Sequence, residues 1–171
     1  MKKTLTLIML VVLMAIGAKA QKFALVDMEY IMKNIPQYEM ANEQLNQLSQ
    51  RWQKEVEAKG KEAENMYQTY LADKVFLTED QIKKREEAIV AKEKEATELR
   101  YKYFGPEGEL YQKRQSLLKP IQDDIYNAIK KVAQERGLQA VMDRASSSDI
   151  IYASPQIDIS NDVLNKLGYG Q

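Results

Sequence analysis

The chain has 171 residues, in which 25 Lys and Arg balance 25 Asp and Glu, and it contains neither histidine nor cysteine. These absences exclude disulfide bonds, thiol nucleophiles and the commonest general base and metal ligands. Charged residues make up 29% of the chain and Gly and Pro are scarce, a composition typical of long exposed helices rather than of one large core.

Residues 1–20 have the pattern of a secretory signal peptide. Met1 to Lys3 is basic, Leu5 to Ile16 is apolar, and Ala18 to Ala20 supplies small residues on either side of a lysine. The apolar run is short for a membrane span, and a retained anchor helix is the alternative interpretation. Because cysteine is absent, no lipid can be attached at the cleavage site. We therefore expect a soluble exported protein.

Cleavage after Ala20 would remove three lysines and no acidic residue. The remaining 151 residues would carry 22 basic and 25 acidic side chains, a net charge of −3. This charge argues against a general nucleic-acid binder, which would carry a basic patch.

The first predicted elements of the exported chain are short. Lys22 to Asp27 places four apolar residues between two charged ones, which indicates a buried strand. Met28 to Lys33 has room for one or two helical turns. Pro36 is tolerated in the first turn of a helix and predicts that a new helix starts there.

Residues 36–119 are predicted to form a long helical hairpin, here called the arm. Its apolar residues fall into two series, and each series has the one-sided spacing of an amphipathic helix. The first series is Leu45, Leu48, Trp52, Val56, Ala63, Met66 and Tyr70, and the second, at intervals of seven, is Val75, Ile82, Ile89, Ala96, Tyr103, Leu110 and Leu117.

The turn of the hairpin is predicted at Leu77–Thr78. Thr78 can cap a helix, Glu79 and Asp80 suit the positive end of the helix dipole, and Gln81 completes a capping box. The return helix should therefore start at Glu79. One continuous helix through this point is the alternative, since no Gly or Pro interrupts it.

The return helix should break at Gly105-Pro106-Glu107-Gly108, because proline removes a backbone donor and glycine weakens a helix. Gly105, Pro106 and Gly108 are candidates for a hinge. Pro120 predicts a second bend, and Gly137 predicts the end of the helix.

The C-terminal part is predicted to contain two strands and a helix. Leu138 to Asp143 and Ile150 to Ala153 read as strands, and the serine-rich loop Arg144 to Asp149 joins them as a hairpin. A short helix should follow within Asp158 to Leu167, capped by Asp158 or Ser160 and stopped by Gly168.

The predicted fold class is α+β, mostly α: an antiparallel helical arm projecting from a small base of strands and a short helix. The base comprises residues 21–35 and 120–171. Such a small base would be only marginally stable alone, so we expect copies of it to associate and share a core. The candidate association residues are Phe23, Leu25, Val26, Val141, Met142, Ile151, Tyr152, Val163 and Leu164.

Catalytic chemistry finds no support in the sequence. Ser146 to Ser148 have no histidine to activate them, and adjacent carboxylates such as Asp123 and Asp124 would diverge on a helix. We expect no enzyme activity, no cofactor and no metal. The remaining signal is an apolar excess near the turn, interpreted either as packing between the helices or as exposed binding surface. These residues are Met66, Tyr67, Tyr70, Leu71, Val75, Phe76, Leu77 and Ile82.

Both ends of the exported chain resemble a known family. Lys22 to Met28 is similar to the opening strand of the Skp/OmpH family of periplasmic chaperones. Ala140 to Asp143, Ile151 to Ala153 and Asp158 to Lys166 are similar, in order and spacing, to its closing block.

This resemblance implies a periplasmic homotrimer. Three subunits would jointly build a β-structured body, and three helical arms would enclose a cavity. The cavity would hold unfolded outer-membrane proteins without ATP. A structural coiled-coil spacer or envelope tether is the alternative function.

The chain departs from the best-known members of this family in the charge of its arm. The best-known members have strongly basic arms, whereas residues 41–100 here hold 11 basic and 13 acidic residues. We therefore do not infer a lipopolysaccharide site from the resemblance. The sequence does not decide whether the arms contact a membrane. The break at residues 105–108 is a second departure.

Overall fold

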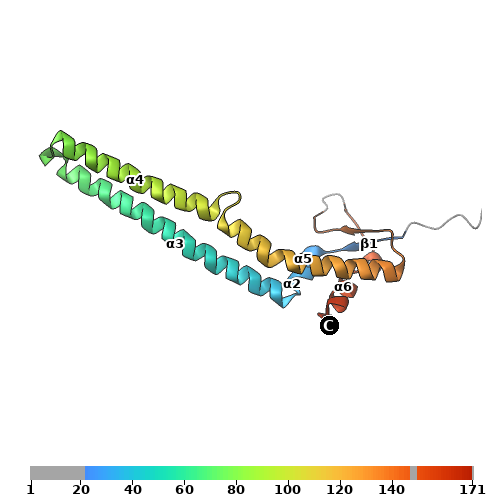
Figure 1. Cartoon of the computed structure of the whole chain (residues 1–171). Coiled ribbons are helices and arrows are strands. Elements are labelled where there is room, and N and C mark those ends of the chain that lie inside the picture. Colours follow the sequence, from blue (N-terminus) through green and yellow to red (C-terminus); the bar gives the residue numbers. More distant parts are fainter. Residues whose placement is uncertain (1–21, 147–149, 171) are drawn as a thin grey trace, which may run out of the picture. The chain divides into compact units, whose positions relative to one another are not determined.

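The computed structural model describes residues 22–146 and 150–170 (Figure 1). Contacts divide the chain into two compact units, one running from Pro36 to Asp123 and the other combining the residues up to Ile35 with those from Asp124 onward. We call the first the arm unit and the second the base unit. In the described part of the chain, no helix is long and apolar enough to cross a bilayer. The proposed signal peptide lies outside the described residues.

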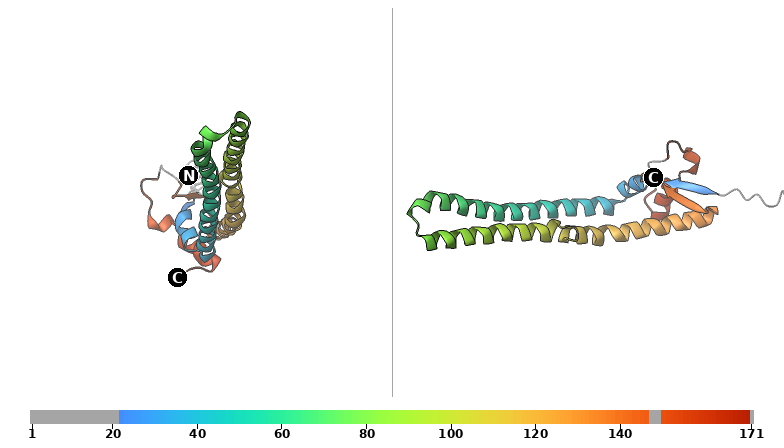
Figure 2. Two further views of the ribbon diagram at one scale, coloured as in Figure 1. Left: turned by 90° about the vertical axis from the view of Figure 1, so that its left-hand side faces the viewer. Right: turned by 90° about the horizontal axis from the view of Figure 1, so that it is seen from above.

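The arm unit contains the predicted helical hairpin. Helix α3 (Pro36–Asp73) and helix α4 (Glu79–Phe104) run antiparallel and side by side in all views (Figures 1 and 2). Apolar residues of both series are buried in this unit, confirming that the spacing marks the packed face. The buried members are Leu45, Trp52, Val56, Ala63 and Tyr70 on α3 and Ile89 on α4.

The turn follows the predicted capping box. The Thr78 hydroxyl accepts the Gln81 backbone N–H at 3.4 Å, and the Gln81 side chain accepts the Thr78 N–H at 2.9 Å. Helix α4 therefore begins at Glu79, as predicted. Helix α3 ends at Asp73 rather than near Leu77, because a 3₁₀ turn, η1 (Lys74–Phe76), makes the reversal.

The predicted break is present between α4 and helix α5 (Glu109–Arg136). Here the Gly108 N–H donates to the Gly105 carbonyl at 2.9 Å, forming a tight turn with Pro106 at its second position. In contrast, α5 passes through Pro120 without interruption. The bond that proline cannot make would use the Ser116 carbonyl, and both residues are exposed, so water can satisfy that oxygen.

The base unit is organised by two parallel strands. Strand β1 (Phe23–Val26) pairs in register with β2 (Ala140–Asp143), and these are the two strands of the described part of the chain. Helix α2 (Met28–Lys33) packs on helix α6 (Ser160–Leu167). Ile31, Ile125, Ile159 and Val163 are fully buried and form the centre of this core.

The end of α5 is also as predicted. Gly137 adopts a left-handed conformation with φ of 64°, and the Leu138 N–H reaches back to the Ala133 carbonyl at 2.9 Å. This arrangement is the usual glycine C-cap.

The predicted strand at Ile150 to Ala153 is absent, and its predicted pairing with β2 is wrong for this chain. Ile151 and Tyr152 are 99% and 84% exposed. The chain instead returns to the sheet after the 3₁₀ turn η2 (Pro155–Ile157), where Asp158 bridges to Leu25 of β1. Residues 147–149 of the predicted loop lie outside the described residues.

The start of α6 differs slightly from the prediction. Ile159 occupies the N-cap position and Ser160 is already helical. Asp158 still binds the first turn, because its carboxylate accepts the Ser160 N–H at 2.9 Å and the Ser160 hydroxyl at 2.6 Å.

Candidate functional site

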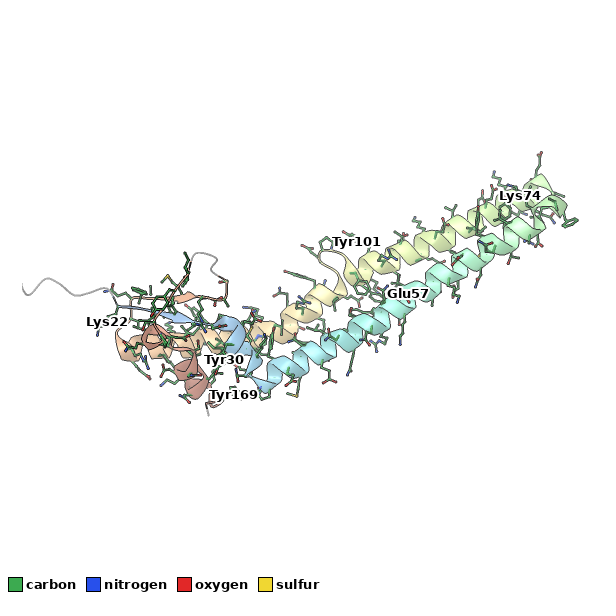
Figure 3. All side chains as sticks on the ribbon, turned by 180° about the vertical axis from the view of Figure 1, so that it is seen from behind. Lys22, Tyr30, Glu57, Lys74, Tyr101 and Tyr169 are labelled. Atoms are coloured by element: carbon green, nitrogen blue, oxygen red, sulfur yellow. The ribbon has the colours of Figure 1, made fainter. Side chains whose placement is uncertain are left out.

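The turn of the arm presents two large apolar side chains to solvent. Val75 and Phe76, in η1, are 83% and 84% exposed. Figure 3 labels Lys74, their neighbour, at the far end of the hairpin. Exposed neighbouring apolar residues at the end of a rigid element are suited to contact with another molecule.

The residues around them explain this exposure. Tyr70 is 3% exposed and its hydroxyl donates a hydrogen bond to the Glu86 carboxylate. Arg85 binds Asp73 at 2.6 Å. Lys74 lies 5.1 Å from the centre of the Tyr70 ring and 3.9 Å from Glu86, and the Tyr70 hydroxyl raises the pKa of Lys74. These contacts fill the inside of the turn and leave Val75 and Phe76 outside.

The other candidate residues near the turn fall into two groups. Tyr67 and Leu71 are 45% and 47% exposed and remain available to a partner. Met66, Leu77 and Ile82 are half-buried. Tyr70 belongs to the packing between the helices, which is the first of the two interpretations of the apolar excess near the turn.

The sequence interpretation missed a groove beside the packed face. It has a volume of about 390 Å³ and lies between α3 and α4, and it is lined by Asn65, Met66, Thr69, Arg85, Ala88 and Ile89. Two further exposed residues of α4 were also missed: Val90 is 61% exposed and Tyr101 71%. The seven-residue repeat could have found them, because both stand outside the buried positions of α4.

The break between α4 and α5 is closely packed. The Trp52 and Tyr103 rings stack with centroids 4.7 Å apart and planes 7° apart. The Tyr103 hydroxyl donates to Glu55 at 2.6 Å, and this hydrogen bond raises the pKa of Tyr103. Lys102 and Glu109 form an ion pair at 3.3 Å across the break.

Neither glycine of the break has room for a side chain. A Cβ at Gly105 would lie 2.4 Å from the Tyr101 carbonyl oxygen, and one at Gly108 would lie 2.8 Å from the Tyr103 carbonyl oxygen. Both obstacles are backbone atoms. The three hinge candidates, Gly105, Pro106 and Gly108, therefore form an ordered turn, and a hinge role for it stays a prediction.

The candidate association residues of the base also divide by exposure. Leu25, Val26, Val163 and Leu164 are buried in the core of the base unit itself, and Val141 is half-buried. Phe23, Met142, Ile151 and Tyr152 are exposed by 50%, 43%, 99% and 84%. Only the second group presents surface on which another copy could pack.

A network of carboxylates surrounds Arg144 in the base. Its guanidinium lies 3.1 Å from Asp27 and 3.4 Å from Asp158. The Ser160 hydroxyl accepts the Asp27 N–H at 2.8 Å. The network joins the ends of β1 and β2 to the start of α6.

Asp143 holds the end of β2 against α2. Its carboxylate accepts the Met28 N–H at 3.1 Å and the Ala145 N–H at 3.0 Å. Partial burial would raise the pKa of Asp143, but hydrogen bonds from the Met28, Ser146 and Ala145 groups outweigh it and hold that pKa below its usual value.

Among residues 22–146 and 150–170, no group of three or more Asp and Glu side chains is arranged to hold a metal ion.

Comparison with known proteins identifies the family. A family model described as "Outer membrane protein (OmpH-like)" matches residues 22–167. The fold is similar to the crystal structure of a candidate outer membrane chaperone (OmpH-like) from Caulobacter crescentus CB15. That match has a TM-score of 0.68 and 16% identity, and it covers 88% of this chain and 86% of the other. No curated protein matches the chain. The chain therefore belongs to the OmpH-like outer membrane protein family.

Proposed function

We propose that the protein is an ATP-independent periplasmic chaperone that holds unfolded outer-membrane proteins. The observation that carries this proposal is the exposure of Val75 and Phe76 at the turn of a long helical hairpin, in a member of the OmpH-like family. The similar Caulobacter protein is described as a candidate outer membrane chaperone (OmpH-like). Such apolar surface can cover apolar segments that an unfolded chain exposes.

The arm would act by contact rather than by chemistry. Four exposed residues supply the apolar area. About half of the surface is exposed at Tyr67 and Leu71, and most of it at Val75 and Phe76. Each contact is weak, so a client can be released without an energy source. Several arms acting on one client would raise the affinity through effective concentration.

We also propose a homotrimer associated through the base, after removal of residues 1–20 on export. The exposed Phe23, Met142, Ile151 and Tyr152 support this, because a small domain with such surface gains stability when copies share it. Ile151 and Tyr152 would then find in a second copy the neighbours that they lack here.

The test uses a double variant of the turn, Val75→Ser with Phe76→Ser. We expect the mature wild-type protein to suppress aggregation of a urea-diluted β-barrel protein at near-stoichiometric trimer. The variant should need several-fold more protein for the same effect, because about 1.5–3 kcal/mol is available per fully buried large apolar side chain.

The matched control is Met40→Ser, since Met40 is 60% exposed on α3 but 35 residues before Val75 in sequence. It should suppress aggregation as the wild type does. A wild-type protein that fails to suppress aggregation across a range of salt would overturn the proposed function. If the wild type and the double variant suppress aggregation equally well, the turn is not part of the binding surface.

A structural coiled-coil spacer, the alternative function, would be built from one uninterrupted helix. Here the turn at Lys74–Phe76 and the capping box at Thr78 interrupt the helix, and this hairpin favours the chaperone.

A further inference from the structure

The two flanks of the α3–α4 hairpin carry different charges. Because α3 buries Val56, Ala63 and Tyr70 against α4 at intervals of seven, the repeat assigns the neighbouring positions to one flank or the other. The groove described above lies on one of them, which we call the groove flank. A second hollow, lined by Lys59, Glu95, Glu98, Leu99 and Lys102, lies on the same flank.

The opposite flank, here called the acidic flank, is defined by nine positions. They are Glu57, Gly60, Glu64, Tyr67 and Leu71 on α3, and Glu86, Val90, Glu93 and Thr97 on α4. Four of the nine are carboxylates and none is basic. Lys83 and Arg100 stand at the equivalent repeat positions just beyond its two ends.

Charges on the groove flank largely neutralise one another. Lys59 binds Glu62 at 3.3 Å and Lys92 binds Glu95 at 2.7 Å. The Lys92–Glu95 hydrogen bond raises the pKa of Lys92 and lowers that of Glu95. Arg85, at the rim of the groove, binds Asp73. This flank therefore offers little unsatisfied charge to a partner.

The carboxylates of the acidic flank are less engaged. Glu86 accepts the Tyr70 hydroxyl and lies 3.9 Å from Lys74, and Glu57 accepts the Gln53 amide at 2.9 Å. Within residues 22–146 and 150–170, Glu64 and Glu93 have no ion pair at 4 Å or less, and both side chains are exposed. Two negative charges are thus available on this side of the arm.

Exposed apolar side chains stand between these carboxylates. Tyr67 is three residues from Glu64 and Leu71 is one turn further, and the two are 45% and 47% exposed. On α4, Val90 is 61% exposed and lies one turn from both Glu86 and Glu93. Apolar and negative groups therefore alternate along the same flank.

We propose that the acidic flank binds unfolded segments in which apolar or aromatic residues stand next to Lys or Arg. The inference rests on the proposed chaperone function and names the class of segment that this arm selects. Charge complementarity supports it, since Glu64 and Glu93 would gain cationic partners while Tyr67, Leu71 and Val90 cover the apolar groups. Exposed ion pairs are individually weak, so the preference comes from several contacts and stays reversible.

The first experiment locates the client. Because the chain has no cysteine, single cysteines can carry a photo-crosslinker without competing labels. Val90→Cys probes the acidic flank, and Ala88→Cys, two residues away and also exposed, probes the groove flank. With the trimeric mature protein and an unfolded β-barrel client, we expect the Val90→Cys adduct to exceed the Ala88→Cys adduct several-fold. Equal adducts, a reversed ratio or crosslinks only between copies of this chain would overturn the assignment.

The second experiment measures selectivity with two labelled peptides of equal apolar content, one carrying Lys and the other Glu. At low ionic strength the wild type should bind the Lys peptide about fivefold more tightly. Glu64→Gln with Glu93→Gln should bring this ratio close to one. The control, Glu87→Gln with Glu98→Gln, makes the same change of charge off the acidic flank and should keep the wild-type ratio.

The outcomes separate this inference from the proposed function. If the wild type protects the unfolded client but its peptide ratio is one, or is unchanged in the Glu64→Gln, Glu93→Gln variant, the flank assignment is wrong and the chaperone function stands. If the wild type neither protects the client nor binds either peptide, both fail.

Discussion

Apolar residues of the arm that look equivalent in sequence differ in exposure. Val75 stands seven residues before Ile82, which predicts a place on the packed stripe, yet it is 83% exposed whereas Ile89 is 5% exposed. The repeat assumes a continuing helix, and α3 ends at Asp73 before Val75 is reached. Periodicity identified Trp52, Val56 and Ala63 correctly because they lie well inside the helix. It could not place side chains in the 3₁₀ turn.

Single residues of the base are expected to make its stability pH-dependent. The folded-state pKa of Asp143 is lower than its ordinary value of 3.8, so its contribution is fully present above that value. It should be lost as the pH falls below about 4 and through the folded pKa. Urea unfolding followed by circular dichroism, at fixed protein concentration, measures this dependence.

The variant Asp143→Ala should lower the free energy of unfolding by about 1–2 kcal/mol at neutral pH, because the Met28 and Ala145 N–H groups lose their acceptor. Its stability should also fall less steeply than that of the wild type as the pH drops below about 4. An unchanged acid profile in the variant would contradict this role.

At the scale of elements, local signals predicted the fold best. The capping box at Thr78 and the C-cap at Gly137 depend on residues a few positions apart, and both are present. The strand predicted at residues 150–153 depends instead on distant pairing with β2, and this chain returns to the sheet only at Asp158, beside β1. Similarly, the groove beside Met66 arises from the packing of two helices and has no signal in either helix alone.

The break between α4 and α5 makes a prediction about glycine. Gly108→Ala should lower the free energy of unfolding by about 1–3 kcal/mol, because its Cβ would meet backbone atoms at 2.8 Å. Gly105→Ala should act in the same direction.

Gly60→Ala is the matched control, and its effect on the free energy of unfolding should be opposite. Gly60 lies inside α3 with nothing within 4 Å of its Cβ position, so alanine should raise the free energy of unfolding by up to about 1 kcal/mol. Thermal unfolding of the variants, monitored by circular dichroism, tests both. Stabilisation by Gly108→Ala would show that the turn is not as tight as described.

The same geometry refines the hinge hypothesis. Substituting Gly105 would test a steric clash more than stiffness, whereas Pro106 is exposed and can be changed alone. Pro106→Ala is therefore the better probe of whether the break lets the arm adapt to clients of different size.

At the scale of the whole molecule, the proposed trimer would unite the two units in one function. The base unit contributes exposed Ile151 and Tyr152 for association, and the arm unit contributes exposed Val75 and Phe76 for clients. The sequence predicted candidate residues for each role, but it could not predict how exposed they are. Which of them contact a second copy depends on neighbours outside one chain.

The most direct test is the mass of the mature protein in solution, measured by native mass spectrometry with and without a urea-diluted β-barrel protein. We expect the mass of three subunits alone, and of three subunits plus one client after dilution. Ile151→Ser with Tyr152→Ser should shift the protein toward the monomer, because the proposed contact loses its apolar surface. A wild-type protein that stays monomeric, or a trimer that never gains the mass of a client, would contradict the account.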